Sequence, residues 1–270
     1  MKIAIIGHGF VGKAVDYGFS HPEIEKVIID PNYGTTTSNT DISECEFLFV
    51  SVPTPMGDGG VIDDSILRRV IGDIEQFNSC GIIIVKSTVV PSAISKLSNR
   101  IVYNPEFLTE KSANEQFVNP VFHILGGEES LCEIVEELYE KYSLCNHADT
   151  FYMTIEEASF TKYAINCFLA TKVLFFNQLY DASKTEPNVN FSVVAKAVGA
   201  DPRITPSHTK VPGFDGKQGF GGACFPKDVS AFLSAYSEMG ILEFVKNTNN
   251  QYRNKYEKDS REIEQNVKFS

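Results

Sequence analysis

A cysteine stands between a glycine-rich loop and the predicted start of a helix. Residues 219–228 read Gly-Phe-Gly-Gly-Ala-Cys-Phe-Pro-Lys-Asp, so Cys224 lies two residues before Pro226. Proline is favoured in the first turn of a helix, where its missing N–H is not needed. The free N–H groups of such a turn, its dipole and Lys227 would all stabilise a thiolate. Cys224 is therefore a candidate nucleophile, the alternative being a small buried cysteine in a glycine turn.

A dinucleotide-binding pattern opens the chain. The apolar run 2–6 leads into Gly7-His8-Gly9-Phe10-Val11-Gly12 and a helix-like stretch. These glycines permit a tight turn, the close approach of a pyrophosphate and the packing of helix on strand. A second apolar run, 27–29, ends at Asp30, where a carboxylate would accept ribose hydroxyls and repel a 2′-phosphate. The sequence predicts NAD as cofactor, and a hydride acceptor beside a candidate nucleophile implies oxidation through a covalent intermediate.

The elements that must position these residues follow a β-α-β rhythm. Apolar runs alternate with helix-like stretches such as 63–77 and 128–142, which is typical of a parallel, doubly wound sheet. We expect an α/β fold with a Rossmann-like NAD-binding domain over residues 1–146, and ligand residues at the carboxyl ends of its strands. The remaining apolar runs lie at 47–50, 82–85, 101–103 and 121–125.

A helical domain is predicted over residues 147–270, and it carries Cys224. It begins with an uninterrupted helical pattern over 154–184. Such a helix would be about 45 Å long, and its length favours a homodimer formed through this helix. Lys162 and Asn166 share one face of the pattern. We interpret the polar residues after 247 as a solvated helix with a frayed end.

Composition and charge limit the classes of function. The 270 residues are 43% hydrophobic and carry a formal net charge of −11, which argues against nucleic acid as a partner. No apolar run is long enough to span a membrane. The six cysteines have neither CxxC nor Cys/His metal spacing, so we expect reduced thiols in a cytoplasmic protein and no metal site. An anionic ligand would then need a local basic site, and the loop 201–222 offers Arg203, Lys210 and Lys217.

The motifs resemble, in order, those of the UDP-glucose/GDP-mannose dehydrogenase family, and they cover nearly the whole chain. Beside the glycine pattern and the Cys224 loop, the similarity rests on Lys162 with Asn166 and on three predicted strand ends. These strand ends read Val52-Pro53-Thr54-Pro55, Ser87-Thr88-Val89-Val90-Pro91 and Asn104-Pro105-Glu106-Phe107-Leu108. The resemblance implies a four-electron oxidation of a nucleotide sugar by two NAD in succession, preferably of UDP-glucose to UDP-glucuronate. GDP-mannose and UDP-N-acetylmannosamine stay open as substrates.

The resemblance also implies roles for the residues of the oxidation steps. Lys162 and Asn166 would handle the proton and stabilise the oxyanion of the first step, with Asp228 ordering a water near them. Cys224 would then attack the aldehyde to give a thiohemiacetal, whose oxidation leaves a thioester.

Hydrolysis of that thioester would need a base, and the resemblance assigns this part to Glu110, with Thr88 holding the water. Glu106 would position substrate or water. The implied NAD contacts are Gly7, Gly9, Phe10, Val11, Gly12, Asp30, Val52, Pro53, Thr54, Ser87, Thr88, Glu110 and Lys227. The implied substrate contacts are Glu106, Phe107, Leu108, Lys162, Asn166, Arg203, Lys210, Lys217 and Gly221.

The sequence also departs from the family pattern. Family members of ordinary length continue into a second nucleotide-binding domain, whereas this sequence ends at Ser270. Thr205 stands where the family usually has glycine, and Gln178 where glutamate is common. Two other classes therefore stay open: a pseudoenzyme that binds NAD or a nucleotide sugar without turnover, and a two-electron 3-hydroxyacid dehydrogenase, which has no need of Cys224 or Glu110.

Overall fold

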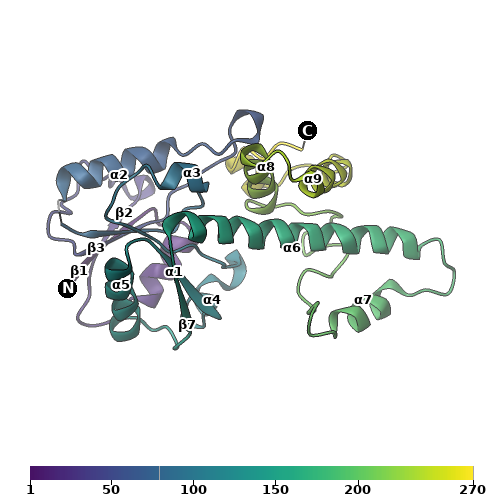
Figure 1. The fold of residues 1–270 in the computed structure, drawn as a ribbon, viewed down its shortest axis with the longest axis horizontal. Helices are drawn as coiled ribbons and strands as arrows, with labels where there is room; N and C mark the ends of the chain where they lie inside the picture. Colours follow the sequence, from purple (N-terminus) through teal and green to yellow (C-terminus); the bar gives the residue numbers. More distant parts are fainter. Residues whose placement is uncertain (79, 270) are drawn as a thin grey trace. The chain divides into compact units, whose positions relative to one another are not determined.

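The computed structural model of the protein describes residues 1–78 and 80–269, which form two compact units. The first unit comprises Met1–Thr54 and Asp63–Lys162, and the second comprises Pro55–Ile62 and Tyr163–Ser270. Helix α6 (Ile155–Ser183) begins in the first unit and ends in the second (Figure 1). Strand β7 (Asp149–Met153) still belongs to the sheet of the first unit, and the domain boundary after residue 146 stays a prediction.

The first unit is built on a seven-stranded sheet with the order β2-β1-β3-β4-β5-β6-β7. All neighbouring strands are parallel except β5 and β6, which pair antiparallel between Tyr103 and Gly126. The segment between these two strands carries a 3-10 helix (Glu110–Ser112) and one short helix, α4 (Ala113–Val118), and the chain returns beside β5 in the opposite direction. The strands are β1 (Lys2–Ile6), β2 (Glu25–Ile29), β3 (Phe47–Val50), β4 (Ile82–Val85), β5 (Ile101–Tyr103), β6 (Phe122–Gly126) and β7.

Helices cover both faces of this sheet, so the predicted doubly wound α/β fold is confirmed. Alternate strand residues point to opposite faces. Ile3 and Ile5 pack in the cluster formed with α1 (Phe10–Gly18), α4 and α5 (Glu129–Tyr142). Ala4 and Ile6 pack in the other cluster, with α2 (Ser65–Phe77) and the short α3 (Pro91–Ile94). The two clusters are the hydrophobic cores on the two faces of the sheet.

The strand order creates one place where loops diverge. After β1 the chain forms β2 on one side, and then crosses back to form β3 on the other side of β1. The carboxyl ends of β1 and β3 therefore flank a topological switch point, which is where open α/β sheets bind ligands. The loops that begin at Gly7, Ser51, Lys86 and Asn104 all leave the sheet at this edge.

The second unit is helical. It contains most of α6, then α7 (Phe191–Gly199), α8 (Phe225–Ala235), α9 (Gly240–Arg253) and α10 (Ser260–Glu264). The rings of Tyr163 and Phe232 stack with centroids 5.5 Å apart, which joins α6 to α8. Short 3-10 helices lie at Pro31–Tyr33, Asp58–Gly60 and Glu110–Ser112. None of the helices in the described part of the chain is long and apolar enough to cross a membrane.

The prediction of a solvated, frayed end after residue 247 is wrong. Helix α9 stops at Arg253, whose side chain is buried, and α10 follows with Glu262 also buried. Beyond α10, Val267 and Phe269 pack on Met56. The sequence pattern misled because buried charged residues that pair with one another have the same composition as a solvated face.

Candidate active site

The turn after β1 has the shape that a pyrophosphate requires. A Cβ added to Gly12 would lie 2.0 Å from the Gly7 carbonyl oxygen, whereas one added to Gly9 would meet no atom within 4 Å. Gly7 has a φ of +85°, which favours glycine. The Asp30 carboxylate closes the turn, because it accepts a 2.7 Å hydrogen bond from the His8 N–H and a 2.8 Å bond from the Asn32 N–H. These residues fit the predicted NAD site; Phe10 and Val11 begin α1 beside them.

The loops after β3 and β4 are joined by hydrogen bonds among the predicted cofactor residues. The Thr54 hydroxyl donates to the Thr88 carbonyl oxygen at 2.8 Å, and the Ser87 hydroxyl donates to the Val52 carbonyl oxygen at 2.7 Å. Both hydroxyls are buried within these loops. Pro53, between them, is exposed. These bonds join the two loops to each other at the switch point.

Lys162 and Glu106 lie together in the first unit. The Lys162 ammonium donates to the Glu106 carbonyl oxygen and lies 3.6 Å from its Oε1, while Oε2 accepts a 2.6 Å bond from the Leu108 N–H. The same ammonium lies 4.8 Å from the centre of the Phe107 ring. Lys162 is 3% exposed, so its charge is held by this loop. Glu110, by contrast, is exposed at the start of a 3-10 helix.

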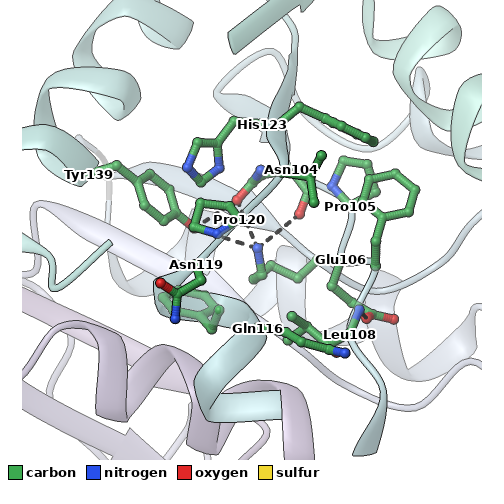
Figure 2. A pocket seen from close by; sticks show the side chains of 14 residues that line it. Asn104, Pro105, Glu106, Leu108, Gln116, Asn119, Pro120, His123 and Tyr139 are labelled. Atoms are coloured by element: carbon green, nitrogen blue, oxygen red, sulfur yellow. Dashed lines mark hydrogen bonds between the residues drawn. The ribbon is translucent and has the colours of Figure 1, made fainter. Parts of the chain in front are cut away.

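Residues of that loop and the buried Lys86 line a cavity of about 230 Å³. Figure 2 shows the side chains of Asn104, His123 and Tyr139 around this cavity. Burial lowers the pKa of Lys86 to about 8. Its ammonium donates to Asn104 Oδ1 at 2.8 Å and to the Asn104 carbonyl oxygen at 3.1 Å, and lies 3.5 Å from the Tyr139 hydroxyl, which itself donates to Asn104 Oδ1. Burial and the Lys86 charge lower the pKa of His123 to about 4. All three ammonium protons of Lys86 are directed to protein oxygens, so this lysine fixes Asn104, the first residue of the Glu106 loop.

In the second unit, Asp228 joins two other candidate residues. Its Oδ2 accepts a 2.6 Å bond from the Asn166 amide, and its Oδ1 accepts a 2.6 Å bond from the Lys227 ammonium. All three side chains are buried. Burial, together with Asp228, raises the pKa of the adjacent Cys167 thiol to about 12. The Lys227 charge, which the sequence suggested would stabilise the Cys224 thiolate, is bound to Asp228.

Cys224 is the N-cap residue of α8 and is half-buried. Its carbonyl oxygen accepts the Asp228 N–H at 2.9 Å, and Pro226 stands in the first turn, as the sequence predicts. The preceding loop takes left-handed φ values at Gly219 (+78°) and Gly222 (+77°), which glycine adopts readily. Asp228 lies one helical turn after Cys224.

The predicted phosphate-binding residues are engaged with their own loop. Arg203 forms a bidentate pair with Asp201 at 2.7 and 3.0 Å. The Lys210 ammonium lies 4.8 Å from the centre of the Phe214 ring, and Lys217 donates to the Glu257 carbonyl oxygen. The Arg203 side chain is nevertheless 86% exposed to solvent while paired with Asp201. The assignment of these residues to a phosphate stays a prediction.

Several residues that hold the site were not among the sequence predictions. Lys86 and Tyr139 fix the Glu106 loop, and Glu262 and Asn249 bind the backbone of the Cys224 loop. For Lys86 the sequence did carry a signal, since a lysine that directly follows a buried strand must have a polar partner. For the other three no sequence signal separates them from surface residues.

Comparison with known proteins places the chain in a family. The description "UDP-glucose/GDP-mannose dehydrogenase family, NAD binding domain" matches residues 31–143, and the description of the same family's central domain matches residues 156–251. The protein belongs to the UDP-glucose/GDP-mannose dehydrogenase family.

Curated relatives agree with this family. The chain is 34% identical over 224 residues to a putative UDP-glucose 6-dehydrogenase, YtcA, of Bacillus subtilis, covering 76% of this chain and 50% of that protein. It is 32% identical over 249 residues to the UDP-glucose 6-dehydrogenase TuaD of the same organism, covering 85% of this chain and 52% of TuaD. The chain thus spans about half the length of these relatives.

Solved structures share the fold. A UDP-glucose dehydrogenase from Pyrobaculum islandicum superposes with a TM-score of 0.75 at 26% identity, covering 93% of this chain and 68% of that one. A 3-hydroxyisobutyrate dehydrogenase from Mycobacterium tuberculosis gives a TM-score of 0.69 at 16% identity, with 90% of each chain covered. The second likeness shows the fold alone.

Proposed function

We propose that the protein oxidises a nucleotide sugar, UDP-glucose, to the corresponding uronate with NAD as oxidant. The observation that carries the proposal is the α8 start, where Cys224 caps a helix whose Asp228 binds both Asn166 and Lys227 in a buried cluster. Burying charged groups costs solvation free energy, and clusters of such groups often mark functional sites. The curated relatives named for UDP-glucose support this substrate over GDP-mannose or UDP-N-acetylmannosamine.

The NAD site is proposed at the switch point of the sheet. The space beside Gly9 would admit the pyrophosphate, and Asp30 would accept the ribose hydroxyls. The joined loops after β3 and β4 would contact the rest of the cofactor through Val52, Pro53, Thr54, Ser87 and Thr88. When bound, NAD supplies the hydride acceptor for both oxidations. A cytoplasmic location fits a cofactor of this kind.

In the first oxidation the sugar C6 hydroxyl must lose a proton while its carbon loses a hydride. We assign the stabilisation of the developing oxyanion to Lys162 and Asn166, since an ammonium and an amide donate to a negatively charged oxygen. The Asp228 carboxylate fixes the Asn166 amide through a 2.6 Å bond and would order the water that takes the proton.

In the second oxidation Cys224 is the proposed nucleophile. Its sulfur adds to the aldehyde carbon to form a thiohemiacetal, which becomes a thioester when that carbon gives up its hydride. A water then gives a proton to the base and attacks the thioester carbon, the carbon–sulfur bond breaks with the Cys224 thiolate as the leaving group, and the acyl carbon becomes the carboxylate of the uronate. Glu110 is the proposed base for this water, which Thr88 would hold. Glu106, Phe107, Leu108 and Gly221 are proposed to contact the sugar nucleotide, with Arg203, Lys210 and Lys217 on its phosphates.

The number of NADH molecules formed per UDP-glucose consumed tests this function. The proposal requires two; one would indicate a two-electron hydroxyacid-type dehydrogenase, and none a binding module.

Cys224→Ser should stop turnover to the uronate, because the hydroxyl is a much weaker nucleophile. The matched control is Cys80→Ser, which changes a cysteine on the surface of the first unit. Full uronate formation by Cys224→Ser would remove this residue from the mechanism.

We also propose a homodimer formed through α6. Phe168 and Phe175, seven residues apart on this helix, are 69% and 57% exposed, and they line a shallow apolar cavity of about 290 Å³ with Val198 and Ile204. Large exposed aromatic side chains of this kind mark interaction surfaces. The doubly substituted Phe168→Glu/Phe175→Glu chain should sediment at 30.0 kDa, whereas wild type and a Phe244→Glu control, which changes an exposed phenylalanine of α9, should sediment at twice that mass. A wild-type monomer would contradict the dimer.

A further inference from the structure

The loop that leads to Cys224 is held by side chains from three separate helices. The Gly219 N–H donates to Asn177 Oδ1 of α6 at 2.9 Å, and the Phe220 N–H donates to Asn249 Oδ1 of α9 at 2.7 Å. The Gly222 N–H donates to Glu262 Oε1 of α10 at 3.0 Å. Asn249 also donates to the Phe220 carbonyl oxygen at 3.0 Å. The backbone of this glycine loop therefore has its position set from outside, because the loop has no secondary structure of its own.

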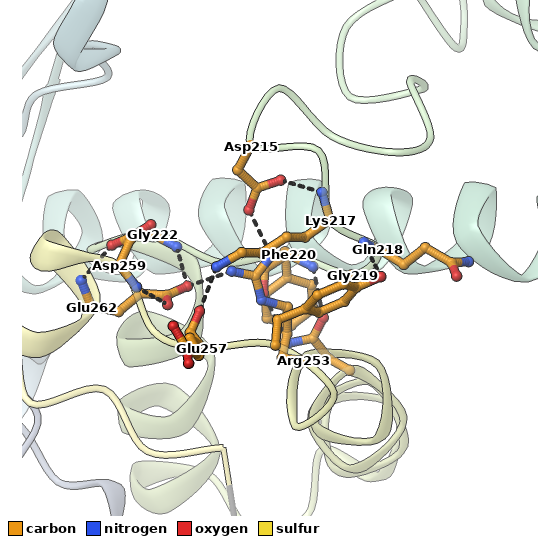
Figure 3. Close-up of polar contacts among 12 residues, drawn as sticks. Asp215, Lys217, Gln218, Gly219, Phe220, Gly222, Arg253, Glu257, Asp259 and Glu262 are labelled. Carbon is orange, nitrogen blue, oxygen red and sulfur yellow. Dashed lines mark hydrogen bonds and ion pairs between the residues drawn. The ribbon is translucent and has the colours of Figure 1, made fainter.

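Glu262 is itself fixed by a buried network (Figure 3). Its Oε1 accepts a 2.6 Å bond from Arg253 Nη2, and its Oε2 accepts a 3.0 Å bond from the Asp259 N–H in a capping box. Arg253 Nη1 donates to Asp215 Oδ2 at 2.7 Å. Arg253 and Glu262 are 1% and 0% exposed. One carboxylate oxygen of Glu262 thus binds both the buried guanidinium and the loop backbone.

Gly221 lies directly against this network, whereas a Cβ added to Gly222 would meet no atom within 4 Å. A Cβ added to Gly221 would lie 2.2 Å from Arg253 Nη2 and 2.4 Å from Glu262 Oε1. The close approach of Arg253 therefore requires glycine at 221, and the loop and the network fit each other only in this arrangement. Buried charged groups cost solvation free energy, and apolar residues of similar volume often stabilise a fold as well. A role beyond stability would account for the charges.

We propose that Arg253 and Glu262 are positioning residues for Cys224. They hold Gly222, two residues before Cys224, so that the cysteine stays at the first turn of α8. Both residues lie outside residues 156–251, the part that matches the family's central domain. The inference rests on the proposed function in one respect, namely that Cys224 reacts with substrate. It adds that Arg253, at the end of α9, and Glu262, on α10, act on the reactive cysteine through the backbone of its loop.

Two variants of Glu262 separate positioning from folding. Glu262→Gln keeps an acceptor oxygen for the Gly222 N–H but weakens the pair with Arg253, whereas Glu262→Ala removes both contacts. The matched control is Val267→Ala, which shortens a fully buried side chain of the same segment whose hydrophobic cluster contains Met56 and Phe269. All three proteins are compared with wild type at a temperature where each is folded by circular dichroism.

The first measurement is the alkylation rate of Cys224 by iodoacetamide in the protein without substrate, followed by mass spectrometry of the peptide that contains it. The second is the kinetics with UDP-glucose and NAD. For Glu262→Ala we expect kcat to fall by roughly tenfold to a hundredfold, as for a displaced reacting group, with the KM for NAD unchanged. We also expect an altered alkylation rate, and partial recovery of both values in Glu262→Gln. Val267→Ala should lower the melting temperature and leave both values at those of wild type.

A wild-type alkylation rate in Glu262→Ala, or the same change in Val267→Ala, would overturn the inference. The alkylation measurement needs no turnover. If wild type formed no NADH from UDP-glucose, the proposed function would fail, and the alkylation rates would still decide whether Glu262 positions Cys224.

Discussion

At the scale of single residues, Thr205 carries backbone strain. Its φ is +66°, a left-handed conformation that is rare for a β-branched residue and costs about 1–2 kcal/mol. The Lys172 ammonium donates to the Thr205 and Ile204 carbonyl oxygens, which holds this turn in place. Thr205 stands where glycine is usual in the family, and glycine would adopt this left-handed conformation without strain.

We therefore expect Thr205→Gly to stabilise the protein. The relief of strain should exceed the entropy cost of glycine, which is roughly 0.5–1 kcal/mol, and the Lys172 bonds to the backbone are kept. Urea unfolding should show a net gain of up to about 1 kcal/mol. The control Thr185→Gly changes an exposed threonine without positive φ and should lose stability. Equal losses in both variants would mean that the Thr205 turn is not strained.

The sequence predicts candidate residues for the chemistry, but it did not indicate the residues that hold them in place. It placed Asp228 near Asn166, which the structure joins directly. It placed Lys227 beside the thiol, whereas the ammonium is bound to Asp228. Glu262 was not recognised, because a buried glutamate on a short polar helix has the same pattern as a solvated one. Pairing between distant charged residues is a tertiary property that local patterns do not encode.

At the scale of elements, the sequence predicted strands β1 to β6 but not β7 (Asp149–Met153), which lies where a helical domain was expected. The strand directions were predicted only in part. Short apolar runs bounded by polar residues became β3, β4 and β5 within the predicted limits. The antiparallel β6 was not foreseen, because direction depends on the path of the segment between β5 and β6 rather than on the strand's own residues. The long helix, predicted over 154–184, spans Ile155–Ser183, since no glycine or proline interrupts it.

The β1–α1 turn allows stability and cofactor binding to be tested separately. Gly12→Ala would bring a Cβ within 2.0 Å of the Gly7 carbonyl oxygen, so we expect a loss of about 1–3 kcal/mol in stability. Gly9→Ala meets no atom within 4 Å and should change stability by less than about 1 kcal/mol. Its methyl group would nevertheless occupy the space proposed for the pyrophosphate, so NAD affinity should fall at least roughly tenfold. Thermal melts and NAD titration measure the two effects; a Gly9→Ala protein that binds NAD as wild type does would move the pyrophosphate elsewhere.

At the scale of the whole molecule, the chain corresponds to about half of its curated relatives. The 249 residues matched to TuaD cover 85% of this chain and 52% of that protein. The model of the family's NAD-binding domain matches residues 31–143 of this chain. The proposed NAD contacts Gly9, Asp30 and Thr54 all lie in the first unit, so a complete surface for NAD is expected in this chain.

The sugar nucleotide presents a different case, because its diphosphate carries charge that must be neutralised. The basic residues proposed for it, Arg203, Lys210 and Lys217, are already engaged with Asp201, Phe214 and Glu257. Each charge-assisted hydrogen bond contributes about 1.5–3 kcal/mol. If the engaged residues keep their internal partners, two such bonds to the diphosphate are not made, and UDP-glucose binds at least roughly a hundredfold more weakly.

We therefore predict that the 270-residue chain binds NAD with an affinity like that of TuaD and binds UDP-glucose at least roughly a hundredfold more weakly than TuaD does. Isothermal titration of both proteins with both ligands provides the comparison, and UDP-glucuronate serves as a second nucleotide-sugar probe. If this chain bound UDP-glucose as tightly as TuaD, the Arg203–Lys217 loop would have to exchange its internal partners for the diphosphate. In that case Arg203→Gln should remove the binding, whereas Arg69→Gln, a substitution of an exposed arginine on α2, should leave it unchanged.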